Sequence, residues 1–189
     1  ATIRGWHHGR IRATRSEKAR EKLTALMPLL LHALGKTANP DIAFTRFDKF
    51  LTGLPSGVQV FALLYSNPRL LDLIAEIVGT APRLADHLAQ RPGLLDVLID
   101  IDFLRHQPDL AELKDSLDAL LRGTKVLEEK LDVVRRWTKD QQFRVGLQLL
   151  RLEIDGIKAG YAFADIAEAA IVALHDAVHA QAVANHGKI

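Results

Sequence analysis

The sequence predicts an all-α fold, with an irregular multi-helix bundle over residues 1–122 followed by a long antiparallel helical hairpin over residues 123–189. Apolar residues recur at intervals of three and four along most of the chain, which is the spacing of one helix face. No segment alternates apolar and polar residues over the length of a strand, so no sheet is expected. Helix-capping residues, prolines and glycines fall mainly between the periodic stretches, where helices begin and end.

The first long helix is predicted to begin at Thr14 and to end at Gly35. Thr14 and Glu17 have the spacing of a capping box, in which a hydroxyl and an acid three residues later satisfy the first free amides. Pro28 falls inside this helix and is expected to kink it.

Two further helices are predicted before residue 66. Asn39 and Pro40 are typical of an N-cap and a first helical residue, and this helix is expected to continue to about Thr52. Ser56 is expected to cap the next helix. Residues 58–65 are apolar except for one glutamine, which predicts a central helix that is buried on most sides.

A short cassette then recurs, consisting of proline, any residue, leucine, leucine or alanine, and an acid. Proline favours the first turn of a helix, and an early acid is favoured by the helix dipole. The intervals between copies are too irregular for a solenoid. The cassette therefore predicts a series of short stacked helices. The four copies of the cassette begin at Pro68, Pro82, Pro92 and Pro108.

The hairpin is predicted from two long helices, at about 125–154 and 157–186, joined by a turn near Asp155 and Gly156. A 30-residue helix is about 45 Å long at 1.5 Å per residue. The second helix is rich in alanine, which permits close contact with a neighbouring helix. Its expected packing face consists of Phe163, Ala167, Ala170, Leu174 and Val178.

A polar stretch at residues 138–142 separates two apolar stripes on the first of these helices, one from Leu127 to Val134 and one from Phe143 to Ile154. We expect either partner contact at this stretch, with Lys139 and Gln142 as candidate residues, or slippage between two packings of the helix. Two pairs on this helix have the i, i+4 spacing of surface ion pairs, Asp132 with Arg136 and Asp140 with Arg144.

The N-terminal segment is strongly basic, although the net charge of the whole chain is only +2. Residues 1–36 contain eight lysines and arginines and two acids. Such a segment can attract nucleic acid, phosphate or an acidic protein surface, or it can be a solvated helix start. Trp6 can contribute to binding or can anchor the segment on the core. The candidate partner-contact residues are Trp6, His7, His8, Arg10 and Arg12.

Two candidate catalytic constellations are weak. Asp100 and Asp102 form the acid-x-acid pair with which nucleotidyltransferases hold magnesium, but no Gly-Ser pair occurs in the chain. The pair is therefore expected to be a solvated helix end. His175 and His179 could chelate a metal from one helix face, but no third ligand is identifiable. The sequence predicts no catalytic, cofactor-binding or metal-binding residue.

The amino-acid composition indicates which partners and which cellular compartment are expected. The chain has no cysteine, which excludes disulfides and thiolate chemistry and suits a cytoplasmic location. No apolar run approaches the roughly 20 residues that span a membrane. The low net charge and the 6% aromatic content disfavour a nucleic-acid partner.

Five stretches together resemble one protein family, the bifunctional glutamine synthetase adenylyltransferase/adenylyl-removing enzymes. They are residues 4–15, which contain Arg-Gly-Trp-His-His-Gly-Arg, and residues 44–51, 66–99, 135–151 and 163–169. The likeness extends over nearly the whole chain, and it is carried by the order and spacing of these stretches. This sequence departs from the family pattern at Leu152, where the family has glycine, and at Ile157 and Lys158, where the family has acids.

The resemblance implies a parent enzyme with an adenylyl-removing domain, a central helical region and a C-terminal adenylyltransferase domain. The Gly-Ser and paired-acid signature of nucleotidyltransferases is missing here. The chain is therefore expected to be the central region, with residues 123–189 leading toward a C-terminal nucleotidyltransferase domain that it does not include.

The implied function is a non-catalytic regulatory or linker region of the enzyme that attaches AMP to glutamine synthetase and removes it again. The parent is expected to use ATP and Mg²⁺, with no cofactor bound by this region. The expected partners are the flanking catalytic domains, and glutamine synthetase and the PII signal protein are further candidates. The alternative is an independent helical protein-interaction adaptor, whose partner binds the basic N-terminus or the alanine-rich hairpin.

Overall fold

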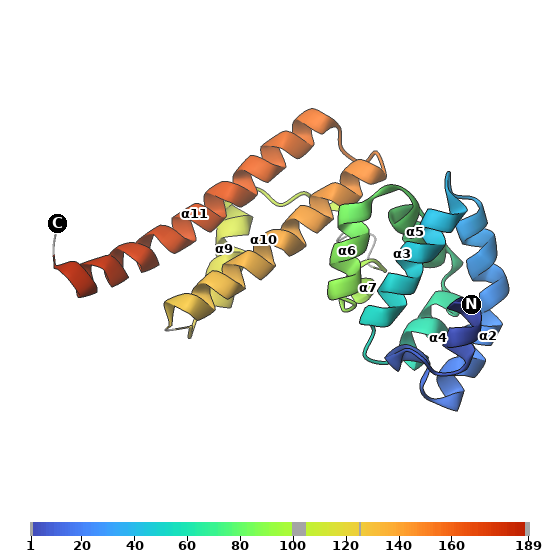
Figure 1. Cartoon of the computed structure of the whole chain (residues 1–189). Coiled ribbons are helices and arrows are strands. Elements are labelled where there is room, and N and C mark those ends of the chain that lie inside the picture. The colour runs from blue at the N-terminus through green and yellow to red at the C-terminus, as the bar shows by residue number, and fades with distance from the viewer. Residues whose placement is uncertain (1, 100–104, 125, 188–189) are drawn as a thin grey trace. The chain divides into compact units, whose positions relative to one another are not determined.

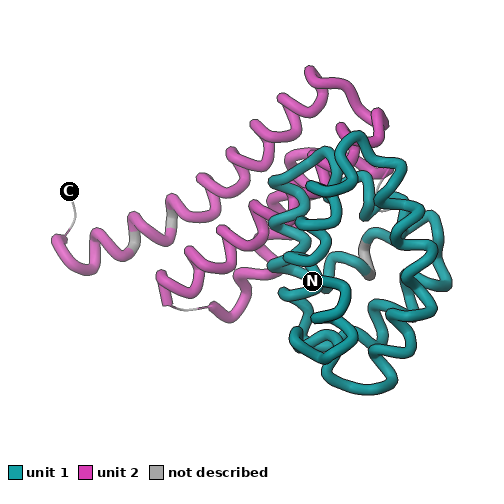
Figure 2. Tube along the Cα trace, turned by 45° about the vertical axis from the view of Figure 1, so that its right-hand side comes forward, with its two compact units in different colours: residues 1–100 teal, residues 101–189 magenta. Residues whose placement is uncertain are grey.

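The structure is a computed structural model that describes residues 2–99, 105–124 and 126–187. Within these ranges all regular structure is helical and no strand occurs, which confirms the all-α prediction. The chain divides into two compact units, Ala1–Asp100 and Ile101–Ile189, which Figure 2 shows in different colours. None of the helices in the described ranges has the length and apolar character that a membrane span requires.

Unit 1 is a bundle of short and medium helices around a core of leucine and phenylalanine. Its α2 helix packs against α4 and α5, and α3 packs against α5 and α6. Phe47 and Phe50 of α3 are completely buried, as are Leu23, Leu26 and Leu30 of α2. The described helices of unit 1 are α1 (Thr2–His7), the 3₁₀ turn η1 (Arg12–Thr14), α2 (Glu17–Gly35), α3 (Pro40–Gly53), α4 (Val58–Ser66), α5 (Pro68–Thr80), α6 (Pro82–Gln90) and α7 (Leu94–Val97).

The start of α2 differs from the predicted capping box. Ser16 is the N-cap, and its Oγ accepts from the Ala19 N–H at 3.2 Å. Thr14 is buried in η1 and donates its hydroxyl to the Ile11 carbonyl, so it is unavailable as a cap. The helix then continues without interruption through Pro28 to Gly35.

The next two helix starts give one confirmation and one correction. Asn39 caps α3, as predicted, by accepting from the Ile42 N–H at 3.1 Å, with Pro40 in the first turn. Ser56 does not cap α4, which follows Gly57 without a side-chain cap. The burial predicted for α4 is observed in part: Phe61 and Leu64 are fully buried, the other apolar residues from 58 to 63 are half-buried, and Tyr65 is exposed.

The proline cassettes divide into two pairs. Pro68 and Pro82 are the first residues of α5 and α6, as predicted. Pro92 and Pro108 instead precede their helices by two residues. The reason at Pro108 is a capping box that the cassette hides: the Glu112 N–H donates to the Asp109 carboxylate and the Asp109 N–H donates to the Glu112 carboxylate, both at 2.9 Å. Asp109 is thus the N-cap rather than a residue of the first turn.

Unit 2 contains three described helices, α9 (Leu110–Leu121), α10 (Leu127–Leu150) and α11 (Gly156–His186). The two long helices run antiparallel and α9 packs against both of them, as Figure 1 shows. Trp137 of α10 donates its indole N–H to the Ser116 hydroxyl of α9 at 3.1 Å. The shared core is made of Leu113, Leu117, Val134, Trp137, Val145, Ala159, Ala162, Ile166 and Ala169.

The expected boundary between residues 122 and 123 is therefore displaced to residues 100 and 101. The physical reason is that α9 buries Leu113 and Leu117 against the hairpin. The first long helix is also shorter than expected, since its 24 residues correspond to about 36 Å.

The packing face of α11 is turned by roughly a quarter turn from the predicted one, at 100° per residue. The buried residues are Ala159, Ala162, Ile166 and Ala169, whereas Phe163 and Val178 of the predicted face are exposed. Three alanines in the contact let α11 lie close to its neighbours. The larger apolar side chains are consequently left toward solvent.

Between α10 and α11 the chain turns through a Schellman motif. The Glu153 N–H donates to the Gln148 carbonyl at 2.9 Å and the Leu152 N–H donates to the Leu149 carbonyl at 3.1 Å. This geometry places Leu152 in the left-handed region, at φ 57°. Glycine is favoured at this position because it has no Cβ, and this explains the glycine implied by the family resemblance. After the turn, the Asp155 carboxylate caps α11 by accepting from the Lys158 N–H.

We predict that Leu152→Gly raises the free energy of unfolding by about 0.5–1 kcal/mol. Relief of left-handed strain, about 1–2 kcal/mol for a residue with a Cβ, outweighs the added entropy of glycine in the unfolded chain. The measurement is urea denaturation. Arg151→Gly is the matched control, because Arg151 has φ −84° and glycine there should destabilise. A loss of stability with Leu152→Gly would contradict the strain.

Candidate interaction surfaces

Trp6 anchors the N-terminal segment on unit 1. Its side chain is buried, its indole N–H donates to an Asp48 carboxylate oxygen at 2.6 Å, and its ring stacks on Phe44 with centroids 5.2 Å apart. A second ring contact, edge to face, is made with Phe47. Of the two roles that the sequence allows for Trp6, the structure therefore supports the anchor, and Trp6 has no surface left for a partner.

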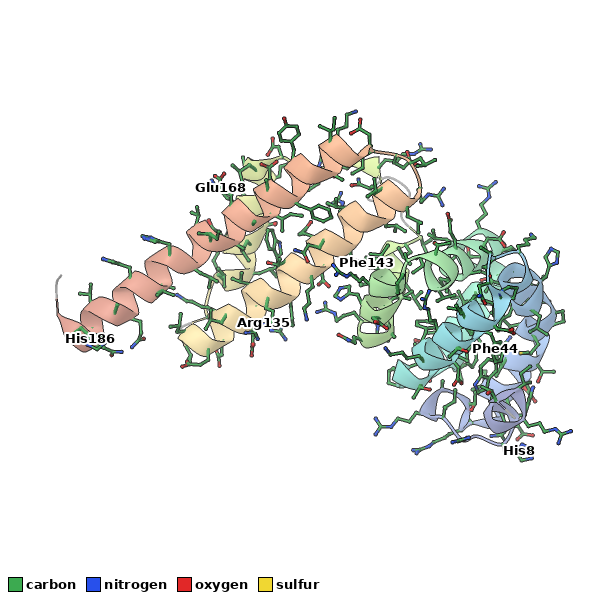
Figure 3. The ribbon with its side chains drawn as sticks, turned by 45° about the horizontal axis from the view of Figure 1, so that its top comes forward. His8, Phe44, Arg135, Phe143, Glu168 and His186 are labelled. Atoms are coloured by element: carbon green, nitrogen blue, oxygen red, sulfur yellow. The ribbon has the colours of Figure 1, made fainter. Side chains whose placement is uncertain are left out.

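The other N-terminal candidates form a basic surface on unit 1. Arg10, Arg12 and His8 are exposed, and His7 is half-buried with its Nδ1 3.5 Å from the Thr24 hydroxyl. Figure 3 labels His8 in this basic part of unit 1. Arg20 differs from these residues because it is half-buried and donates to backbone carbonyls, to that of Arg15 at 2.8 Å and to that of Thr14 at 3.2 Å. The described candidates that can meet an anionic partner are thus His8, Arg10 and Arg12.

Lys139 and Gln142 are exposed on α10, as partner contact requires. The polar stretch that contains them does not break the helix, which runs from Leu127 to Leu150. Buried residues lie on both sides of it, Trp137 before and Phe143 after. Lys139 and Gln142 therefore lie on the exposed side of a continuous helix, whereas the other three residues of the stretch are half-buried. Arg135, labelled in Figure 3, pairs on the same helix with Asp132 at 2.6 Å.

A buried polar cluster in unit 2 was missed by the sequence analysis. Arg144 and Gln148 of α10 both donate to the His106 carbonyl, at 2.5 and 3.2 Å. Both side chains are buried, so the surface position predicted for Arg144 is wrong. The i, i+4 spacing of an arginine and a glutamine within an apolar stripe is the signal that could have found it. The cluster holds the segment before α9 against α10.

Burial changes the pKa of the arginine in this cluster. Desolvation lowers the pKa of the Arg144 guanidinium from its ordinary value, and the Glu112 carboxylate raises that pKa in opposition. Arginine stays charged because its ordinary pKa is far above neutrality. A charged donor therefore reaches the His106 carbonyl, and such hydrogen bonds are stronger than neutral ones.

We predict that Arg144→Ala lowers the free energy of unfolding by about 1.5–3 kcal/mol, the range for losing a hydrogen bond from a charged group. Thermal or urea denaturation measures it. Arg135→Ala is the matched control on the same helix, and its exposed ion pair should change stability by less than about 1 kcal/mol. Equal small effects at both positions would show that the contact with His106 is not stabilising.

The metal-binding candidates that the sequence offers are one pair of aspartates and one pair of histidines. No group of three or more His, Asp or Glu side chains converges among the described residues. Asp100 and Asp102 lie outside the described residues, so the structure does not place this pair. His175 and His179 stack with ring centroids 6.1 Å apart on α11.

Comparisons with known proteins establish the family. Residues 71–189 match the family model described as glutamate-ammonia ligase adenylyltransferase. The chain belongs to this family. It is 49% identical over 187 residues to the bifunctional glutamine synthetase adenylyltransferase/adenylyl-removing enzyme of Mesorhizobium japonicum, and 44% identical to that of Brucella suis. The Caulobacter vibrioides protein of the same name is 43% identical over 183 residues.

The match covers most of this chain but little of the adenylyltransferase relatives. The matches to the Mesorhizobium and Brucella proteins each cover 99% of this chain and 19% of the relative. The match to the Caulobacter protein covers 96% of this chain and 18% of the relative. The chain thus spans about a fifth of the length of these relatives. The adenylyltransferase family model begins within α5 and includes all of unit 2. The N-terminal basic surface is covered by the individual relatives rather than by the family model.

Proposed function

We propose that this chain is a non-catalytic regulatory or linker region of an enzyme that adenylylates and deadenylylates glutamine synthetase in the control of nitrogen assimilation. The observation that carries the proposal is the alignment of nearly the whole chain with a fifth of the bifunctional relatives. The missing Gly-Ser and paired-acid signature supports a non-catalytic role for this fifth.

The length of the two hairpin helices is suited to holding two flanking domains apart. The two helices of 24 and 31 residues are about 36 and 46 Å long, and α9 stiffens them by packing against both. In this role the partners are the flanking catalytic domains of a cytoplasmic parent enzyme, which binds ATP and Mg²⁺ outside this chain. Glutamine synthetase and the PII signal protein are further proposed partners, and the exposed basic side chains of unit 1 offer a surface for an acidic one.

A second candidate function is an independent helical adaptor. The observation that favours it is the exposed basic surface formed by His8, Arg10 and Arg12, which needs no catalytic domain to attract an acidic protein. It differs from the first candidate in requiring no covalent connection to a nucleotidyltransferase.

The proposed function predicts that the isolated chain transfers no AMP. Without carboxylates that hold magnesium, nothing stabilises the charge on the phosphoryl group that is transferred. The assay mixes the chain, glutamine synthetase, Mg²⁺ and labelled ATP, with the full-length enzyme as positive control. Transfer above background would contradict the proposal. If that transfer survived Asp100→Asn with Asp102→Asn, its site would have to lie elsewhere in the chain.

A second prediction concerns Lys139 and Gln142 in the full-length enzyme. Lys139→Ala with Gln142→Ala should leave folding unchanged, because both side chains are exposed, but should alter the response of the two activities to glutamine. Both activities are measured with and without glutamine. The matched control is Glu128→Ala with Glu129→Ala, exposed at the start of the same helix. Activities and responses equal to wild type would leave α10 as a spacer without a signalling role.

A further inference from the structure

The outward face of α11 is apolar, which is unusual for a helix face that meets solvent. Ile157, Tyr161 and Ile171 are 75%, 71% and 67% exposed, and Val172 and Val178 are about half exposed. At 100° per residue these five side chains fall on the side opposite the buried Ala162 and Ile166. We call this surface the α11 outer face; it comprises Ile157, Tyr161, Ala164, Glu168, Ile171, Val172, His175, Val178 and His179.

The single acidic or basic residue on this face other than histidine is Glu168, and it is already paired. Its carboxylate is 3.0 Å from the Lys114 ammonium of α9. Figure 3 labels Glu168 midway along α11. Covering the α11 outer face would therefore bury the Glu168 carboxylate together with its Lys114 partner, which avoids the cost of burying that carboxylate alone.

A small hollow adjoins the face along its edge toward α9, beside Val172. It has a volume of about 180 Å³, and it lies between α9 and α11. Lys114, Asp118, Ala169, Val172 and Ala173 line it. Interfaces bind most tightly where an apolar side chain of one partner enters such a recess of the other. The face thus combines an extended apolar stripe with a recess for one anchoring side chain.

We infer that the α11 outer face is the docking surface for a catalytic domain of the same polypeptide. On globular proteins, a contiguous patch of exposed apolar side chains often marks an interaction site. The relatives are about five times as long as the matched region, so four-fifths of their chain is available to cover the face. The docked surface is apolar, and it places one side chain in the hollow beside Val172. This inference rests on the proposed function, because it requires a parent enzyme.

The test uses the absence of cysteine from the chain. Ile157→Cys and Ile171→Cys place single thiols on the face, and Glu128→Cys at the exposed start of α10 is the control. Each variant is made in this chain and in the full-length enzyme. Labelling by a maleimide is followed by peptide mass spectrometry, which separates these thiols from any cysteine elsewhere in the full-length protein.

The expected result is that all three thiols react at similar rates in this chain, whereas the two face thiols react about ten-fold or more slowly in the full-length enzyme. Ten-fold corresponds to about 1.4 kcal/mol of docking free energy. Equal rates in the two proteins would overturn the inference. Protection in this chain that disappears on dilution would also overturn it, in favour of a second copy as the occupant.

The labelling result and the AMP-transfer result are independent. If the isolated chain transferred AMP while the face remained protected in the full-length enzyme, the proposed function would fail and the docking surface would stand. If the chain were inactive and the face equally reactive in both proteins, the proposed function would stand and the docking surface would fail.

Discussion

The packing of α9 against both long helices is the interaction on which unit 2 depends. Two antiparallel helices alone leave much of each apolar stripe in contact with water, and α9 covers this surface with Leu113 and Leu117. The Trp137 indole fixes the register between α10 and α9 through its hydrogen bond to Ser116. Arg144 and Gln148 then hold the segment before α9 through the His106 carbonyl. Unit 2 is thus a three-helix unit rather than a two-helix hairpin.

Helix caps and turns that depend on hydrogen bonds between near neighbours in the chain were predictable from the sequence. Asn39 caps its helix as predicted, and the turn near Asp155 forms where it was expected. Thr14 was mistaken for a cap because its hydroxyl bonds locally within a 3₁₀ turn, and a hydroxyl two residues later caps the helix. The N-cap of α9 was missed because the proline cassette drew the helix start to Pro108.

Which face of a helix packs against its neighbours was not predictable in the same way. The sequence of α11 offers apolar residues on nearly every side, so periodicity cannot decide which side packs. Close approach to α9 and α10 selected the alanine-rich side and left Ile157, Tyr161 and Ile171 exposed. Among the candidate contact residues, burial removed Trp6 and left Lys139 and Gln142 on the surface. Family membership followed from the order of sequence stretches, since no catalytic motif was present to find.

The central claim, that α9 joins the two long helices in one cooperative unit, is tested most directly by native-state hydrogen exchange. The account predicts that the amides of Leu117, Trp137 and Ile166, one from each helix, open with the same free energy, as members of one cooperative unit do. Amides after Val178 should exchange faster, because the last turns of α11 extend past the start of α10 (Figure 1). Rapid exchange throughout α9, with α10 and α11 still protected, would contradict the claim and return unit 2 to a two-helix hairpin.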